Sequence, residues 1–512
     1  MLDNLDQGQE EEDAVSRFPT IAAIALVVVI AGCSAQTTQS ATPGPTKGTQ
    51  FKDVNVNILT FNGPQVAEPL QRRAPDFEQL TGAHVNVVAV SFGTLYDKAL
   101  LDASTKTNSF DAYVFDPQWL GDFTGPGYLL DLTAKVNADT SLNWQDIGPF
   151  FRDFNASYNG KVYTVPLDGD FHMVYYRKDL LAKDNLKPPA TWDDYIAIAK
   201  KYQGQDLNAD GQPDYGSCIA QKKGAQSYWW IISIAAGLLQ GTGTNEGAFF
   251  NTKDMQPLTN NEAFAKALDM YKQTKDVGPP DQLNMDVGGT RGLFKTGRCA
   301  LSMDWGDIGT LVPGTYAQDK TGATITPGWK EVLNRDTGKL VPCDATTCPK
   351  AVDGVNYAPF ASFGGWSGAV NAAAPKDRQD AAYAFLSYMS APPQSGIDVT
   401  LGKTGFNPYR TSHFSSNDLW IKAGLSADAA TNYLGAIKAS LQSPNMVLDM
   451  RIPKTKQYEE VVLDTAVSQY LAGELDAAAT MKQITDGWNE ITDAQGRDKQ
   501  LAAYVASLGV AR

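Results

Sequence analysis

Short apolar segments and longer helical segments alternate between residues 54 and 115 of this chain. Strands are predicted at 54–59, 85–88 and 112–115, and helices over 66–80 and 95–104 connect them. Adjacent parallel strands need a long crossover connection, which is usually a helix. The alternation therefore predicts an α/β fold with a parallel sheet that has helices on both faces.

The same alternation continues through the rest of the chain. Strands are predicted at 215–220 and 299–303, and helices over 191–202, 227–239, 261–274, 377–389, 458–472 and 475–491. Thr191, directly before Trp-Asp-Asp, is the expected N-cap of the first of these helices. Residues 311–357 lack a strong period and are rich in Gly, Pro, Asp and Thr, so we expect a long loop insertion there.

The N-terminal region has the features of an export signal. The apolar run at 21–30 is too short to span a bilayer and suits a secretory signal, and the Ala-Gly-Cys that ends at Cys33 resembles a bacterial lipobox. This resemblance implies lipidation of Cys33, removal of residues 1–32 and an extracytoplasmic protein anchored to the membrane by lipid. Residues 33–50, rich in Thr, Ser, Gly and Pro, are predicted to form a flexible tether. Residues 1–14 are acidic where a signal is basic, and we interpret them as a start-site artefact.

Charge and cysteine content limit the class of protein further. The net charge of −14 argues against nucleic acid as a partner, because such proteins present a basic surface. Besides Cys33 the chain has four cysteines, and an even number in an exported protein indicates disulfides. Three pairings are conceivable. A small loop closed by Cys343 and Cys348, which leaves Cys218 to pair with Cys299, is the favoured one.

Several sequence pieces occur together in one order, and they carry a family resemblance. They are Asn-Gly-Lys-Val-Tyr-Thr-Val-Pro at 159–166, Tyr-Tyr-Arg-Lys-Asp-Leu at 175–180, Pro-Pro-Ala-Thr-Trp-Asp-Asp at 188–194, Phe-Lys-Thr-Gly-Arg-Cys-Ala-Leu at 294–301 and Gly-Gly-Trp-Ser-Gly-Ala-Val at 364–370. With these pieces the chain resembles the carbohydrate-type extracellular solute-binding proteins of ABC importers, the group of the maltose-binding type. The insertion at 311–357 departs from the shorter members of that family.

The resemblance implies a two-lobed periplasmic-binding-protein-like fold of type II with a multi-crossing hinge. Lobe one would be residues 51–169 and 360–402, and lobe two residues 172–358 and 404–512, with crossings near 168–172, 359–363 and 402–407. A monomer that delivers a sugar or oligosaccharide to a membrane permease is the implied function. A phosphorylated polyol or another non-sugar solute, and an extracytoplasmic glycosidase, are the alternatives. A pair of carboxylates across a scissile bond would be needed for the glycosidase.

A sugar cleft needs aromatic rings that stack on the ring faces of the sugar and polar groups that hold its hydroxyls. By resemblance, the cleft residues are Asp116, Trp119, Asp168, Asp170, Tyr228, Trp229, Asp304, Trp305, Trp366 and Arg410. The alternatives are a turn with a packed ring at 116–119, a capped hinge turn at 168–170 and an interlobe salt bridge for Arg410. Trp230, which follows Trp229, is expected in the core and not in the cleft. Tyr458 is the weakest candidate for the cleft.

Residues 206–214 read D-x-N-x-D-G-x-x-D, which resembles an EF-hand-type calcium loop. The expected ligands of a structural Ca²⁺ are Asp206, Asn208, Asp210, Gln212 and Asp214. Ser217 stands where such loops have a bidentate Glu, so weak binding is expected, and a plain turn is the alternative. No other cofactor is expected.

Overall fold

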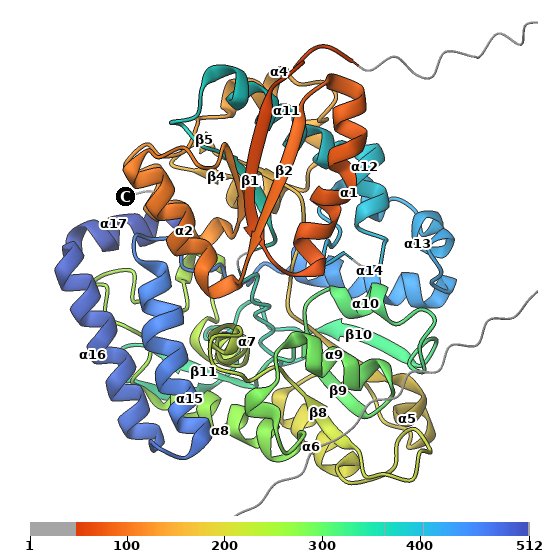
Figure 1. Cartoon of the computed structure of the whole chain (residues 1–512). Coiled ribbons are helices and arrows are strands. Elements are labelled where there is room, and N and C mark those ends of the chain that lie inside the picture. Colours follow the sequence, from red (N-terminus) through yellow and green to blue (C-terminus); the bar gives the residue numbers. More distant parts are fainter. Residues whose placement is uncertain (1–47, 363, 403, 510–512) are drawn as a thin grey trace, which may run out of the picture. The chain divides into compact units, whose positions relative to one another are not determined.

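The structure is a computed structural model that describes residues 48–509 apart from 363 and 403 (Figure 1). The predicted signal peptide, Cys33 and the tether up to residue 47 lie outside the described residues. Residues 48–50 are held in place, because Gly48 N donates to Gln79 O at 2.9 Å and Phe51 N to Thr81 O at 2.8 Å. No described helix is both long and apolar enough to cross a membrane.

One sheet has five strands in the order β2-β1-β3-β13-β6. Its strands are β1 (Asn55–Phe61), β2 (His84–Val90), β3 (Ala112–Phe115), β6 (Thr164–Pro166) and β13 (Ser367–Val370). The strand β1 pairs in parallel with β2 and β3, which confirms the parallel sheet predicted for the first segment, whereas β13 runs antiparallel to β3 and β6. Helices α1 (Pro64–Thr81), α2 (Phe92–Thr105) and α11 (Lys376–Ser390) pack against this sheet (Figure 1).

The other large sheet has four strands in the order β10-β7-β9-β8. Its strands are β7 (Met173–Arg177), β8 (Tyr215–Cys218), β9 (Cys299–Asp304) and β10 (Thr321–Ile325). The main helices on this side are α6 (Trp192–Tyr202), α7 (Ser227–Leu239), α8 (Glu262–Asp276), α9 (Val287–Lys295), α14 (Ala427–Leu441), α15 (Asp464–Ala472), α16 (Ala477–Gln495) and α17 (Arg497–Ser507). The apolar helix α7 is buried along its whole length.

The start of α6 shows how local sequence determines an element. Asp194 N donates to Thr191 Oγ1 at 3.0 Å, and Thr191 N donates to Asp194 Oδ2 at 2.9 Å. This reciprocal capping box satisfies amide groups that the first helical turn leaves without partners. The prediction of Thr191 as N-cap is confirmed.

The short helices connect these elements. They are α3 (Leu120–Thr124), α4 (Thr133–Ala138), α5 (Lys178–Lys183), α10 (Asp307–Leu311), α12 (Pro392–Asp398) and α13 (Asp418–Lys422). Two π-helical segments, Phe150–Asn155 and Gln457–Leu463, also occur. The second of them begins the segment that we predicted as one helix over 458–472.

The prediction of a long loop at 311–357 is wrong. The strand β10 joins the four-stranded sheet by antiparallel pairing with β7, and β11 (Glu331–Asn334) and β12 (Lys339–Pro342) form a hairpin. These strands are short and rich in small or polar residues, so they carry no periodic pattern. Pairing with a neighbouring strand rather than local propensity decides their conformation.

The chain passes between the two large sheets several times. It leaves the five-stranded sheet after β6, enters β7 directly, and returns at β13. It leaves again after α12 to reach α14, which packs on β10. Later, Arg451 donates to Phe154 O at 2.5 Å and to Ser157 O at 2.6 Å, so this segment contacts the side of the five-stranded sheet once more.

The structure contains both favoured disulfides. Cys218–Cys299 joins the adjacent strands β8 and β9, and Cys343–Cys348 closes a small loop after β12. Their sequence separations are 81 and 5 residues.

We expect the two disulfides to differ in their contribution to stability. In the chain-entropy model a longer closed loop restricts the unfolded chain more, so replacing Cys218 and Cys299 by Ala should cost about 4.5 kcal/mol of unfolding free energy. Replacing Cys343 and Cys348 should cost about 2 kcal/mol and serves as the matched control. Urea denaturation measures both. Free thiols in the denatured, unreduced chain from residue 48 onward would contradict the pairing.

Candidate functional site

A small cavity of about 50 Å³ lies between the two large sheets. Phe61 at the end of β1 and Trp366 just before β13 line it from the side of the five-stranded sheet. The other side contributes Gln226, Arg291, Trp305 and Asp307, and the connections between the sheets contribute Asp170 and Gly405. The predicted residues Asp170, Trp305 and Trp366 are thus brought together from distant parts of the chain.

Aromatic rings form two walls of this cavity. The rings of Phe61 and Trp366 stack with centroids 5.5 Å apart and planes inclined by 6°. Trp305 lies 5.3 Å from Trp229 and 4.0 Å from His172, and its Nε1 donates to Gln226 Oε1 at 2.9 Å. Trp230 stacks on His172 at 4.0 Å and belongs to the core, as expected. Flat rings held in this way can receive the apolar face of a small molecule.

A buried arginine organises the polar side of the cavity. Arg291 Nη2 lies 2.6 Å from both Asp304 Oδ1 and Asp307 Oδ2. Asp304 also accepts from Trp305 N at 2.6 Å, so this predicted residue stands behind the cavity and does not line it. Asp307 Oδ1 is buried without a hydrogen-bond partner among the described residues, and Asp307 lines the cavity. It is therefore free to accept a hydrogen bond from a ligand hydroxyl.

Sequence reasoning did not select Arg291 or Asp307. Asp307 follows the end of the predicted strand by four residues, which was a usable signal, whereas nothing near Arg291 indicates that its side chain turns inward to β9. A buried arginine between two carboxylates becomes visible only in the tertiary structure.

Asp168 connects three passages of the chain between the sheets. Its carboxylate accepts hydrogen bonds from Gly169 N at 2.7 Å, Trp366 N at 3.2 Å and Asn407 N at 2.6 Å. We call this arrangement of Asp168, Trp366 and Asn407 the clasp. Gly365 has φ +104°, and a Cβ there would lie 2.4 Å from Asp168 O, so this glycine allows the close approach. Asp168 does not line the cavity.

Asp116, Trp119, Tyr228 and Trp229 form a neighbouring group outside the cavity. Asp116 accepts from the backbone and side-chain nitrogens of Gln118 at 3.2 and 3.1 Å. Phe92 links the two sides, with its ring 6.1 Å from Trp119 and 6.2 Å from Trp229. All four predicted residues are buried in this structure.

Two further candidates lie elsewhere. The fully buried Arg410 donates to Leu142 O at 2.8 Å, to Asn143 O at 3.2 Å and to Asp146 at 3.3 Å, as well as to Ser390. These contacts occupy its guanidinium group, so its expected role as a ligand contact is not supported. Tyr458 packs its ring on Phe250 and Trp488.

The structure gives no support to the predicted calcium site. Asp214 pairs with Arg298 at 2.6 Å, and Asp206 accepts from Asp210 N and Gly211 N as in an ordinary turn. Asn208 donates to Thr296 O, and Gln212 N donates to Asp210. Over the described part of the chain, no three acidic, His or Cys side chains converge in a geometry suited to a metal ion.

The clasp predicts a strong effect of a conservative substitution. Asp168→Asn keeps the size but replaces one carboxylate oxygen by a donor, which cannot accept from Trp366 N or Asn407 N. Losing hydrogen bonds to a buried charged acceptor should lower the unfolding free energy by about 2–4 kcal/mol. Denaturant unfolding at neutral pH measures it, with the exposed Asp153→Asn as control. A change as small as that of the control would show that the clasp contributes nothing.

Buried carboxyl groups also predict how stability depends on pH. Burial raises the pKa of Asp168 to about 6 and that of Asp307 to about 7. Unfolded, these groups ionise near pH 4, so between about pH 4 and about pH 7 the folded state holds more protons. Their contribution to stability is therefore lost as the pH rises through this window.

The melting temperature of the ligand-free protein should accordingly be higher at about pH 5 than at about pH 8. Asp307→Asn removes one of the titrating groups and should reduce this difference. An unchanged difference in the variant would contradict the assignment.

Comparison with known proteins identifies relatives of this chain. A family model described as bacterial extracellular solute-binding protein matches residues 63–395. The chain is 28% identical over 296 residues to the mannitol-binding protein of Pseudomonas aeruginosa, which is 56% of this chain and 63% of that protein, so the match spans less than two thirds of it. It is 25% identical over 410 residues to a probable amino-acid ABC transporter periplasmic-binding protein of Sinorhizobium fredii, covering 76% of this chain and 82% of that one.

Solved structures share the fold. A solute-binding protein of Agrobacterium radiobacter in complex with ribitol aligns with a TM-score of 0.70 at 22% identity, covering 86% of this chain and all of that one. One from Agrobacterium vitis with D-mannitol aligns with a TM-score of 0.65 at 21% identity, covering 86% and 99%. The predicted two-lobed α/β fold is thereby confirmed. Because the family model spans more than half of its length, the chain belongs to the bacterial extracellular solute-binding protein family.

Proposed function

We propose that this protein is the receptor of an ABC importer and binds a sugar or a sugar alcohol between its two lobes. The observation that carries the proposal is the cavity in which Trp305 and Trp366, from opposite sheets, lie with Asp170 and Asp307. The names of relatives that bind mannitol and of neighbours that hold ribitol and D-mannitol support this ligand class. As a member of a solute-binding family the chain is not an enzyme, so the glycosidase alternative is dropped.

The charge of the cavity lining favours a neutral, hydroxylated group inside it. The cavity holds only about 50 Å³ in this structure, well below the usual volume of ligand pockets, so the lobes would have to move apart to admit a sugar unit. A phosphorylated polyol is disfavoured, because Arg291 is already neutralised by Asp304 and Asp307. Carboxylate oxygens accept hydrogen bonds, which suits a ligand rich in hydroxyl donors.

The lobes in this proposal are residues 51–169 with 360–402, and residues 172–358 with 404–512. Ligand contacts from both lobes exist only when the lobes are closed, so a ligand shifts the population toward the closed form. The permease would recognise that form. The clasp lies where the chain passes between the lobes and would act as the hinge.

Export and anchoring complete the proposal. We infer an extracytoplasmic protein, lipidated at Cys33 and monomeric, on the lipobox-like sequence and the tether. The two disulfides support an oxidising compartment. A fatty-acid analogue should label the wild type and leave Cys33→Ala unlabelled.

A thermal-shift screen tests the ligand class. The panel is D-mannitol, ribitol, maltose and, for a non-sugar solute, the L-amino acids. A ligand that binds only the folded state raises the melting temperature. A shift with amino acids alone would overturn the sugar assignment.

For a compound that binds, Trp305→Ala and Trp366→Ala should weaken affinity by about 30- to 1,000-fold, which corresponds to the 2–4 kcal/mol of hot-spot residues. Isothermal titration calorimetry measures this. Trp192→Ala is the matched control, because Trp192 is fully buried, packs on Tyr195 and does not line the cavity. It should lower stability by about 3–5 kcal/mol and leave affinity unchanged. Undiminished affinity in both cavity variants would refute the site.

A further inference from the structure

Four carboxyl groups gather beside the proposed sugar site. They are Asp116, Asp449, Glu459 and Glu460, and we call them the acidic cluster. Trp229 connects it to the cavity, because its Nε1 donates to Asp449 Oδ2 at 3.1 Å while its ring lies 5.3 Å from Trp305. The cluster is thus one tryptophan away from the cavity wall.

The cluster is assembled from both lobes. Asp116 follows β3 of the five-stranded sheet, whereas Glu459 and Glu460 lie on the π-helical segment Gln457–Leu463, which packs on α7 and α16. π-Helical turns are rare in proteins, and those that do occur are often found at functional sites. Closing the lobes therefore brings these carboxyl groups together.

The cluster has more hydrogen-bond acceptors than donors. Both carboxyl oxygens of Glu459, Oε1 of Glu460 and Oε1 of Gln118 have no hydrogen-bond partner among the described residues. Gln118 is fully buried, and its Nε2 donates to Asp116, which places its free oxygen at the cluster. Against these four oxygens stand two buried groups that can donate and have no described partner, the Tyr228 hydroxyl and Trp119 Nε1. The strongest electrostatic neighbours of the Tyr228 hydroxyl are Glu460 and Asp116.

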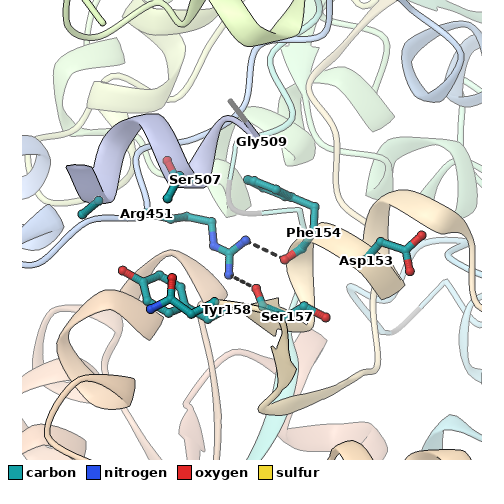
Figure 2. Close-up of a pocket in the computed structure, with 11 residues that line it drawn as sticks. Asp153, Phe154, Ser157, Tyr158, Arg451, Ser507 and Gly509 are labelled. Carbon is teal, nitrogen blue, oxygen red and sulfur yellow. Dashed lines mark hydrogen bonds between the residues drawn. The ribbon is translucent and has the colours of Figure 1, made fainter. Parts of the chain in front are cut away.

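No basic side chain of the described residues forms an ion pair with these carboxyl groups. Arg451 is close in sequence to Asp449, but its two terminal nitrogens donate to the backbone oxygens of Phe154 and Ser157 and not to the cluster (Figure 2). Lys456 pairs with Asp97 at 2.8 Å. Buried carboxylates without a counter-ion are costly, so the ligand-free protein keeps protons on them. Burial raises the pKa of Asp449 to about 7 and that of Glu460 to about 8.

We propose that the solute carries a cationic amine, as an amino sugar or amino sugar alcohol does, and that its ammonium group binds at the acidic cluster while its hydroxylated part occupies the cavity. An ammonium group offers three donors and no acceptor, which matches the surplus of acceptors. In the ligand-bound form its positive charge takes the place of the protons that keep the cluster neutral in the ligand-free protein. The inference rests on the proposed function, since it names the class of solute for the same site.

Matched pairs of compounds test this inference. D-glucosamine is compared with D-glucose, and 1-amino-1-deoxy-D-glucitol with D-glucitol, by calorimetry near neutral pH. The amine of at least one pair should bind tenfold or more tightly than its neutral counterpart. Because the carboxyl groups ionise when the cation enters, binding should release protons, which appears as a dependence of the enthalpy on the buffer used.

Variants assign the effect to the cluster. Glu459→Gln and Asp449→Asn keep size and shape but remove charge, so each should abolish most of the preference for the amine and the proton release. Glu474→Gln, on the exposed surface, is the control for net charge. If one variant does not fold, the other still tests the cluster. The release of protons is measured on the wild type and needs neither variant.

The possible outcomes distinguish a failure of the cationic solute from a failure of the proposed sugar receptor. Binding of a neutral member as tight as that of its amine, without release of protons, overturns the cationic solute and leaves the sugar receptor standing. If both variants still prefer the amine to its neutral counterpart, the acidic cluster is not the site that binds the ammonium group. Binding of neither member of either pair, with no hit in the wider sugar panel, refutes the proposed function and the cationic solute with it.

Discussion

The carboxylate of Asp168 is the contact on which the relation between the two sheets depends. It accepts hydrogen bonds from Trp366 N and Asn407 N, which lie on two different passages of the chain, and is itself part of a third. A single acceptor thus ties together segments that are 198 and 239 residues away from it. Because it is completely buried, water cannot replace these bonds, and the connections have one well-defined arrangement.

The cavity follows from this arrangement. Trp366 is positioned by its own backbone bond to Asp168, so the ring that faces Trp305 is oriented by the same group that joins the lobes. Asp170, two residues further on, accepts from Asn407 Nδ2 at 2.5 Å and reaches the cavity wall. In this structure the hinge and the proposed ligand site are therefore one connected network, which is the physical basis for coupling binding to closure.

Electrostatics opposes the closed arrangement while hydrophobic packing supports it. Rings from both lobes, such as Phe92 and Trp229, exclude water and bury apolar surface. The acidic cluster and the pair of Asp168 and Asp170 place carboxyl groups in the same interior, where burial penalises their ionised forms. A solute that supplies hydrogen-bond donors or positive charge would change this balance, whereas a purely apolar one would not.

Much of the fold could be predicted because it depends on local patterns. The first three strands and two helices, the cap at Thr191 and the pairing of the four cysteines all depend on residues near in sequence or on simple counting. Trp305 and Trp366 could be proposed because they follow a strand end or a glycine pair at the sheet edge. The role of Arg410 could not be decided from the sequence, because an arginine that serves as a ligand contact and one that binds backbone carbonyls look the same there.

By itself the sequence determined the α/β class, the family and most elements, since periodicity and capping act over a few residues. Only the tertiary structure decided that β10 completes a sheet, that Arg291 lies between Asp304 and Asp307, and that Glu459 and Glu460 meet Asp116. These features depend on which distant groups share one buried volume. Whether a carboxyl group is an exposed surface charge or a buried partner of other acids is a property of that volume and of no local pattern.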